Sequence, residues 1–309
     1  MRSVIVISFD TECSRDFGTH CEMCSFGYVV ADDSFNVEIS RNCYIKASKP
    51  TGRQKKAMKI PYEKFSDAPE YGSVYPILSD IFSQKDAIYI SNSPENDFRY
   101  ICSMNRKYGR EQISCKAYDI LTIVRNYADL PSYSLPGIMH TFGLKYNRKE
   151  ENANAKACLE ILKFLCKEEK TSLEQLLLVC GKGAMVDSEV INHRTLLKFR
   201  QERLNAYFDK KPKNGRFSGT VFSMSESFEG TKIEIGFHVA EYITHHGGIL
   251  TRKVSDSDVF IWDGMLDSKR LESVNMNSTP IEVISTDQLF SADFMPEKAG
   301  KKNYEEQSS

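Results

Sequence analysis

A short apolar run that ends abruptly in acidic residues constrains the fold of this chain more than any other feature. Residues 4–9 read VIVISF, and Asp10, Thr11 and Glu12 follow at once. An apolar run of this length is typical of a buried strand, and alternate side chains of a strand share a face. Asp10 and Glu12 therefore lie side by side, where they repel each other unless a cation such as Mg²⁺ or Mn²⁺ lies between them. The string predicts a strand that ends at a candidate metal site.

Strand-like and helix-like segments alternate through the first 167 residues, which predicts an α/β fold. Strands are expected at 2–9, 26–31, 36–46 and 87–91. Helices are expected at 73–83, 97–107, 118–126, 134–142 and 153–167.

A change in composition near residue 180 predicts two domains. The chain has 309 residues, and all nine cysteines lie between residues 13 and 180. Beyond a basic stretch with one predicted helix at 187–206, strand and helix signals follow in βαββαβα order, which predicts a small, mostly parallel sheet flanked by helices. We therefore expect a first domain at 1–180, a basic helical linker at 181–214, a second domain at 215–293 and a disordered tail at 294–309.

Composition indicates a soluble intracellular protein. The formal net charge is −1, from 41 basic and 42 acidic residues, so global charge neither requires nor excludes a nucleic-acid partner. Without a long apolar run or a leader, we expect no membrane contact and a cytoplasmic protein, with the nucleoid or the nucleus as alternatives. Cys13, His20, Cys21 and Cys24 include a C-x-x-C, but no second ligand pair follows, so we expect reduced thiols rather than zinc.

Four stretches of the first domain carry a resemblance to a known family. They are FDTE followed by SFGYVV, SDAPEYGSVYPILSDIF, DAIYISNSPENDFRYI and YDILTIVRNYADLPSYSLPGIMHTFGL. Together they resemble the DnaQ-like, or DEDD, exonucleases, which have an RNase H-like fold. The resemblance implies a mixed sheet with flanking helices and 3′-to-5′ hydrolysis of phosphodiester bonds by two Mg²⁺ or Mn²⁺ ions. Asp10, Glu12 and Asp97 would be the metal ligands.

The resemblance breaks at the last motif of the family, where a His stands five residues before a fourth Asp. Residues 146–165 contain neither. Alignment through NAKACLEIL puts Asn154 at the Asp position and Lys149 at the His position, whereas alignment on ENANAKA puts Lys156 and Glu151 there. Asn154 keeps an oxygen that can coordinate a metal but adds no charge, so we expect it as the fourth member of a weakened catalytic site. A lost general base lowers the rate by ~10²- to 10⁴-fold.

Other carboxylates near this motif are candidate replacements for the missing one. Glu150, Glu151 and Glu160 could turn toward the site, and Tyr146 with Glu150 faintly resembles the tyrosine branch of the family, although the alanine expected next is missing. Asp119 is expected to be a helix-terminal residue rather than a ligand.

A basic stretch at 41–59 predicts contact with a nucleic-acid backbone. It carries seven Lys/Arg and no acidic residue. The residues expected to contact nucleic acid are Arg53, Lys55, Lys56, Lys59 and, from the second motif, Asn92.

The second domain resembles the BRCT family. The residues that carry this resemblance are FSGTVFSMS, a helix that ends in Gly247-Gly248, DVFIW, SKRL and IEVISTDQLF. The resemblance implies binding to a protein partner and a phosphate pocket in which Ser225 and Lys269 match the family. Glu226 replaces the glycine of that pocket and would repel phosphate.

Two functions follow from these resemblances. The first is a 3′-to-5′ exonuclease, weakened by the missing Asp and His, that acts on 3′ ends in DNA replication or repair, with DNA favoured and RNA as the other candidate. The alternative is a catalytically silent nuclease fold that serves, with the BRCT-like domain, as a nucleic-acid or protein binding module.

Overall fold

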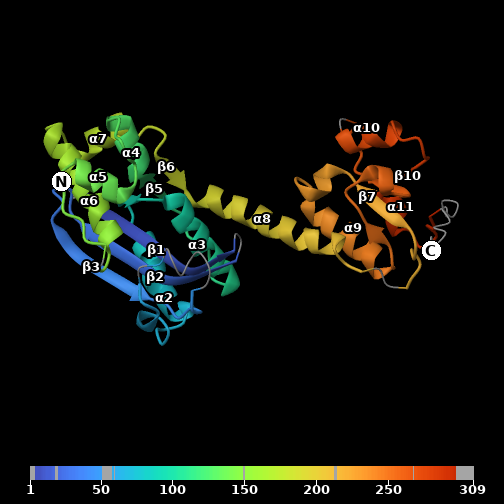
Figure 1. Cartoon of the computed structure of the whole chain (residues 1–309), viewed down its shortest axis with the longest axis horizontal. Coiled ribbons are helices and arrows are strands. Elements are labelled where there is room, and N and C mark those ends of the chain that lie inside the picture. Colours follow the sequence, from blue (N-terminus) through green and yellow to red (C-terminus); the bar gives the residue numbers. More distant parts are fainter. Residues whose placement is uncertain are drawn as a thin grey trace, which may run out of the picture. The chain divides into compact units, whose positions relative to one another are not determined.

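The computed structural model describes residues 4–17, 20–50, 58, 60–148, 150–211, 214–266 and 268–296 (Figure 1). The chain divides into two compact units, Met1–Thr195 and Leu196–Ser309. No helix among the described residues has both the length and the apolar content that a membrane crossing requires.

The first unit is built on a mixed sheet of six strands in the order β3-β2-β1-β4-β5-β6. Strands β1, β2 and β3 form an antiparallel meander, β4 and β5 run parallel to β1, and β6 is antiparallel to β5. The strands are β1 (Val6–Phe17), β2 (His20–Ala31), β3 (Val37–Tyr44), β4 (Ile88–Ser91), β5 (Lys116–Asp119) and β6 (Met185–Asp187). The predicted α/β fold with a mixed sheet and flanking helices is confirmed.

Helices cover both faces of this sheet, because the strands carry apolar side chains on both faces. Ile7 and Phe9 pack with the helices α2 (Tyr71–Phe82) and α3 (Pro94–Lys107). Val6 and Val29 pack on the opposite face with four helices. These are α4 (Ile120–Tyr127), α5 (Leu135–Thr141), α6 (Ala153–Glu168) and α7 (Leu173–Cys180).

The predicted end of the first strand at residue 9 is wrong, so Asp10 and Glu12 lie within the strand and not after its end. Strand β1 continues to Phe17, because β2 pairs with it throughout, with Asp10 opposite Gly27 and Glu12 opposite Ser25. The two carboxylates therefore lie in the middle of a long hairpin, on the face that α6 covers.

Short elements account for the other differences in the first unit. The segment predicted as a helix at 118–126 begins as strand β5, and Asp119 then caps α4 by accepting hydrogen bonds from Leu121 N (2.9 Å) and Thr122 Oγ1 (2.8 Å). Asp119 is thus the helix-terminal residue that was predicted. Strand β6 and helix α7 were not predicted, while the helix predicted at 187–206 is α8 (Ser188–Phe208).

The second unit contains a parallel sheet of four strands in the order β10-β9-β7-β8, as predicted. Its strands are β7 (Val221–Met224), β8 (Ile249–Leu250), β9 (Val259–Trp262) and β10 (Glu282–Ser285). The helices α9 (Ile233–His245) and α11 (Thr286–Phe290) pack on one face, and α10 (Lys269–Asn275) packs on the other. A single 3₁₀ turn, η2 (Glu226–Glu229), follows β7. The tail predicted to be disordered lies outside the described residues from residue 297 onward.

Candidate functional site

Asp10 and Glu12 are half-buried and line two adjoining hollows of the first unit. The first hollow opens over β2 and β3 and is closed by the segment 150–154 that leads into α6. Its other lining residues include Ser25, Gly27, Asn42, Tyr44, Lys64 and Arg148. The second hollow lies toward the start of α3 and is lined by Thr11, Ser93, Asn96, Asp97 and Tyr100 among others. The two carboxylates of the first motif therefore stand where a ligand could reach them.

Asn154 contacts Asp10 through its nitrogen rather than its oxygen. The Asn154 Nδ2 group donates hydrogen bonds to Asp10 Oδ1 (3.2 Å) and Asp10 Oδ2 (3.1 Å). The Asn154 Oδ1 atom accepts a hydrogen bond from the Tyr146 hydroxyl (2.6 Å). The oxygen that could coordinate a metal is thus engaged by Tyr146, and an N–H donor faces the carboxylate.

Asp97 is held from the opposite face of β1. Its Oδ1 atom accepts hydrogen bonds from Thr11 N (3.0 Å) and Thr11 Oγ1 (2.6 Å), and its Oδ2 atom accepts one from the Ser91 hydroxyl. Thr11 lies between Asp10 and Glu12 in the strand, so its side chain points away from theirs. Asp97 is only 3% exposed, and burial raises its pKa to about 7 although these hydrogen bonds favour the charged form.

These contacts do not fit a two-ion site. Such a site needs several oxygen ligands turned toward one another, and among the residues that the structure describes no group of three or more His, Cys, Asp or Glu side chains is placed to hold a metal ion. Asp97 is engaged by Thr11 and Ser91, and the Asn154 amide covers the carboxylate of Asp10. Cys13, Cys21 and Cys24 are buried and form no disulfide.

The segment 150–154 is held over the sheet by hydrogen bonds with three side chains, two of them from β3. Glu151 accepts hydrogen bonds from the Tyr44 hydroxyl (2.9 Å) and Lys64 Nζ (3.2 Å), and these groups hold the pKa of Glu151 below its usual value. Asn152 adopts the left-handed conformation (φ 60°) and donates to Ser40 Oγ (3.3 Å). This fastening sets Asn154 opposite Asp10.

Gly27 leaves room for the side chains of Asn152 and Asn42 over β2. A Cβ atom at Gly27 would lie 2.4 Å from Asn152 Oδ1 and 2.9 Å from Asn42 Oδ1. A larger residue at this position would require the side chains of Asn152 and Asn42 to turn away.

The structure thus places Asn154, and not Lys156, opposite Asp10. Lys156 points to Glu150, with 3.9 Å between Nζ and Oε2, and Lys149 lies outside the described residues. Glu150 and Glu151 line the first hollow with Asp10, but Glu150 pairs with Lys156 and Glu151 is bonded to Tyr44. Glu160 is exposed, and among the described residues no group of three acidic side chains forms around Asp10.

The predicted nucleic-acid contacts fall mostly on residues that the structure does not describe. Arg53, Lys55, Lys56 and Lys59 lie outside the described residues. Asn92 follows β4, and its buried Oδ1 atom has no hydrogen-bond partner among the described groups.

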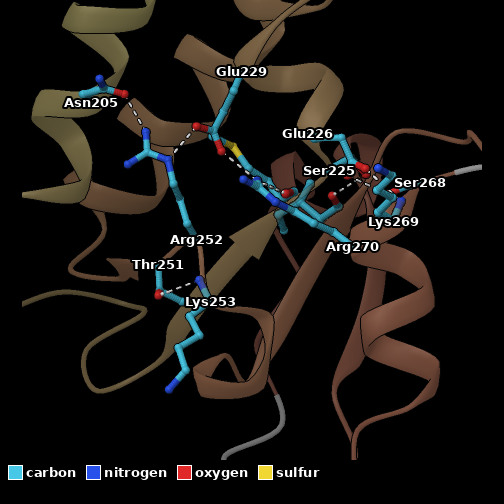
Figure 2. A network of polar contacts seen from close by, with 12 residues as sticks. Asn205, Ser225, Glu226, Glu229, Thr251, Arg252, Lys253, Ser268, Lys269 and Arg270 are labelled. Carbon is cyan, nitrogen blue, oxygen red and sulfur yellow. Dashed lines mark hydrogen bonds and ion pairs between the residues drawn. The ribbon is translucent and has the colours of Figure 1, made fainter.

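The predicted phosphate residues of the second unit surround a carboxylate that belongs to the chain. Figure 2 shows Glu226 beside Ser268 and Lys269, with the buried Ser225 next to it. Glu226 Oε2 accepts from the Ser268 hydroxyl (2.7 Å), and Glu226 Oε1 accepts from the backbone N–H of Lys269 (2.8 Å). Burial opposes ionisation, yet these hydrogen bonds outweigh it and lower the pKa of Glu226. Glu226 therefore caps the start of α10.

A second carboxylate of the same turn joins two arginines. Glu229 pairs with Arg252 Nε and Arg270 Nη1 at 2.6 Å each, and Arg270 Nη1 also donates to Met224 O (2.8 Å) (Figure 2). Arg252 and Arg270 are thus both engaged by Glu229.

Sequence reasoning missed the contacts that hold the predicted site residues in place. Thr11 and Ser91 fix Asp97, Tyr146 fixes Asn154, and Gly27 admits Asn152. The alternation of side chains in a strand could have placed Thr11 opposite to Asp10, but contacts across 86 residues leave no local pattern.

Several solved structures of exonucleases match this chain over about half of its length. No protein-family model matches the sequence, and no curated protein matches it. Exonuclease I with the inhibitor BCBP has a TM-score of 0.49 and 14% identity, and the match covers 55% of this chain and 42% of that chain. E. coli Exonuclease I with a dT13 oligonucleotide has a TM-score of 0.48 and 14% identity, and the match covers 54% of this chain and 42% of that chain.

A third structure describes 3′-end specific recognition of histone mRNA stem-loop by a 3′-exonuclease, with a TM-score of 0.47, 12% identity, and coverage of 55% of this chain and 84% of that chain. This chain spans about two fifths of the length of the Exonuclease I structures. At these TM-scores and identities the likeness concerns the general fold and says nothing of activity.

Proposed function

We propose that this protein is a nucleic-acid binding protein in which a DnaQ-like nuclease fold no longer hydrolyses its ligand. The observation that carries the proposal is the contact of the Asn154 amide with both oxygens of Asp10. A hydrolytic site of this class needs carboxylate oxygens turned toward metal ions, and here a hydrogen-bond donor takes that place. The hollow around Asp10 is lined by Lys64 and Arg148 but also by four carboxylates, so we assign the attraction for phosphate groups to the basic stretch beside it.

The ligand we propose is a 3′ end, of DNA in the first instance and of RNA as the second candidate. The basic stretch 41–59 adjoins Lys64 in sequence and adds seven Lys/Arg without an acidic residue. Neutralising phosphates releases counterions, so such a stretch supplies affinity without reading sequence.

We propose that residues 215–293 of the second unit form a BRCT-like module that binds a protein partner without phosphate. Support comes from its parallel four-stranded sheet with helices on both faces. The carboxylate of Glu226 between Ser268 and Lys269 argues against a phosphate ligand there. A role of the whole chain in DNA replication or repair follows from these two modules.

A weakened exonuclease is the second candidate function, and one observation favours it. Asp10, Glu12 and Asp97 all line the second hollow, so three of the four carboxylates of the family are near one another. In that case Mg²⁺ or Mn²⁺ would be required for activity.

One experiment separates the two functions. Purified protein is incubated with 3′-labelled single-stranded DNA and RNA in Mn²⁺ and in EDTA, beside Asp10→Ala. We expect binding in both conditions and no shortening of the label in either. Shortening in Mn²⁺ that disappears in Asp10→Ala would establish the exonuclease, and failure to bind either oligonucleotide would reject nucleic-acid binding.

The basic stretch is tested by the salt dependence of binding. Replacing Lys55, Lys56 and Lys59 by Ala should lower the slope of log K against log[salt] by about 0.7 for each lost phosphate contact. The matched control replaces three lysines of the α6 end, Lys163, Lys167 and Lys170, which are exposed and lie outside the basic stretch. An unchanged slope in the first variant, or an equal change in both, contradicts the role of the basic stretch.

A further inference from the structure

We propose that the side-chain amide of Asn154 takes the place of a divalent cation at Asp10, and that Tyr146 keeps the nitrogen of this amide turned toward Asp10. The inference rests on the proposed function and deepens it, because it explains why binding by the first unit should need no metal ion.

The geometry at Asp10 is that of a carboxylate satisfied by a donor from the protein. Both oxygens of Asp10 accept a hydrogen bond from Asn154 Nδ2, at 3.2 Å and 3.1 Å. An ion that bridged β1 and α6 would have to displace these hydrogen bonds. A cation and an N–H group both place positive charge in front of a half-buried carboxylate and stabilise its ionised form.

The orientation of the amide follows from its two partners. An ionised carboxylate only accepts hydrogen bonds, whereas a tyrosine hydroxyl can donate one. The carboxylate of Asp10 favours the Asn154 nitrogen, and the hydrogen bond that Tyr146 donates to Asn154 Oδ1 at 2.6 Å stabilises the same orientation. Without the hydroxyl of Tyr146, the amide could turn and present its oxygen to an ion.

The backbone around Asn154 is fixed independently of this contact. Glu151 is bonded to Tyr44 and Lys64, and Asn152 is bonded to Ser40. A substitution at Asn154 therefore changes the group that faces Asp10 while its neighbours keep the segment in place. Asn154→Asp would bring a third carboxylate beside Asp10 and Glu12, which is the oxygen-rich environment that Mn²⁺ takes.

The experiment measures metal binding alone, with no nucleic acid present. The wild-type chain, Asn154→Asp and the control Asn147→Asp are titrated with MnCl₂ by calorimetry, and their thermal unfolding is recorded in Mn²⁺ and in EDTA. Asn147 is an exposed residue that lines a different hollow, so its replacement adds the same charge elsewhere. We expect Asn154→Asp to bind Mn²⁺ at least about tenfold more tightly than the other two, because the affinity of such sites follows the number of charged ligands.

Thermal unfolding gives the second readout. Asn154→Asp should unfold at a lower temperature than the wild type in EDTA, because two carboxylates then face each other, and should recover in Mn²⁺. The wild type should unfold at the same temperature in both. Equal Mn²⁺ affinity of wild type and Asn154→Asp would overturn the inference.

Tyr146→Phe provides an independent test if Asn154→Asp does not fold. This variant keeps the uncharged amide but frees it to turn, so it should gain measurable Mn²⁺ affinity over the wild type. No gain in Tyr146→Phe would overturn the inference in that case. Because nucleic-acid binding is measured separately, a chain that fails to bind oligonucleotides but behaves as expected here rejects only the proposed function.

Discussion

At Asp97, burial and hydrogen bonding act in opposite directions on one carboxyl group. The side chain accepts three hydrogen bonds, from Thr11 N, Thr11 Oγ1 and Ser91 Oγ, which stabilise the charged form. Burial nevertheless raises its pKa to about 7. The folded chain therefore holds a proton on Asp97 over a range of pH in which the unfolded chain has lost it.

Stability should consequently fall as pH rises from about 4 to about 7. The folded pKa is raised above the unfolded value of about 3.9, so the contribution is fully present below that value and is lost as pH passes through the folded pKa. The slope from this group is at most about 1.4 kcal/mol per pH unit. Asp97→Asn should remove that slope, since the amide oxygen still accepts from Thr11 and its nitrogen can donate to Ser91.

Urea unfolding of the wild type and of Asp97→Asn at several pH values measures the slope directly. Asp33→Asn is the matched control for the loss of one carboxylate, because Asp33 is exposed in the turn before β3. The explanation fails if Asp97→Asn keeps the slope of the wild type.

At the scale of elements, one glycine decides how closely α9 approaches η2. A Cβ atom at Gly236 would lie 2.0 Å from the backbone oxygen of Phe228, which cannot move without shifting the turn. This approach holds η2 in the position from which Glu226 reaches the start of α10.

Gly236→Ala should therefore destabilise the second unit, although alanine favours helices by about 1 kcal/mol over glycine. Overpacking of this kind costs about 1–3 kcal/mol, and here the obstacle is backbone. His238→Ala introduces the same residue at an exposed position of the same helix and should leave stability nearly unchanged. Denaturant unfolding of both variants checks the difference, and equal stability of the two would contradict the steric argument.

The elements themselves were largely predictable, and the contacts between them were not. Apolar periodicity correctly predicted β3, α2, α3, α5 and α6 to within a few residues. It failed for β5 because Lys116–Asp119 is too short to show a period, and for β1 because a paired hairpin needs no continuous apolar run. Asp10 and Asn154 are 144 residues apart in the sequence, so no local pattern predicts their contact. Nor does any local pattern predict which atom of the amide faces the carboxylate.

At the scale of the whole molecule, the chain carries a separate natural probe in each unit. Trp262, the one tryptophan of the sequence, lies in β9 of the second unit, whereas all nine cysteines lie between residues 13 and 180. Cys43, Cys115 and Cys166 are partly exposed, and the other six are buried. Thiol labelling therefore reports on the first unit and tryptophan fluorescence on the second.

Core substitutions should shift only the probe of their own unit. Phe98 is fully buried in the first unit and Phe222 in the second, and each packs in a hydrophobic cluster made of residues from that unit alone. Phe98→Ala should lower the stability reported by thiol labelling in urea by about 3–5 kcal/mol and leave the fluorescence transition in place. Phe222→Ala should do the reverse. A shift of both transitions by either variant would show that the two units unfold together.

Glu226 also has a consequence for competition between ligands. A carboxylate tethered beside Ser268 and Lys269 is present there at an effective concentration of about millimolar or more, whatever the composition of the solution. A phosphorylated partner at micromolar concentration would have to displace a group that never diffuses away. The start of α10 would therefore bind a phosphate group from solution only weakly.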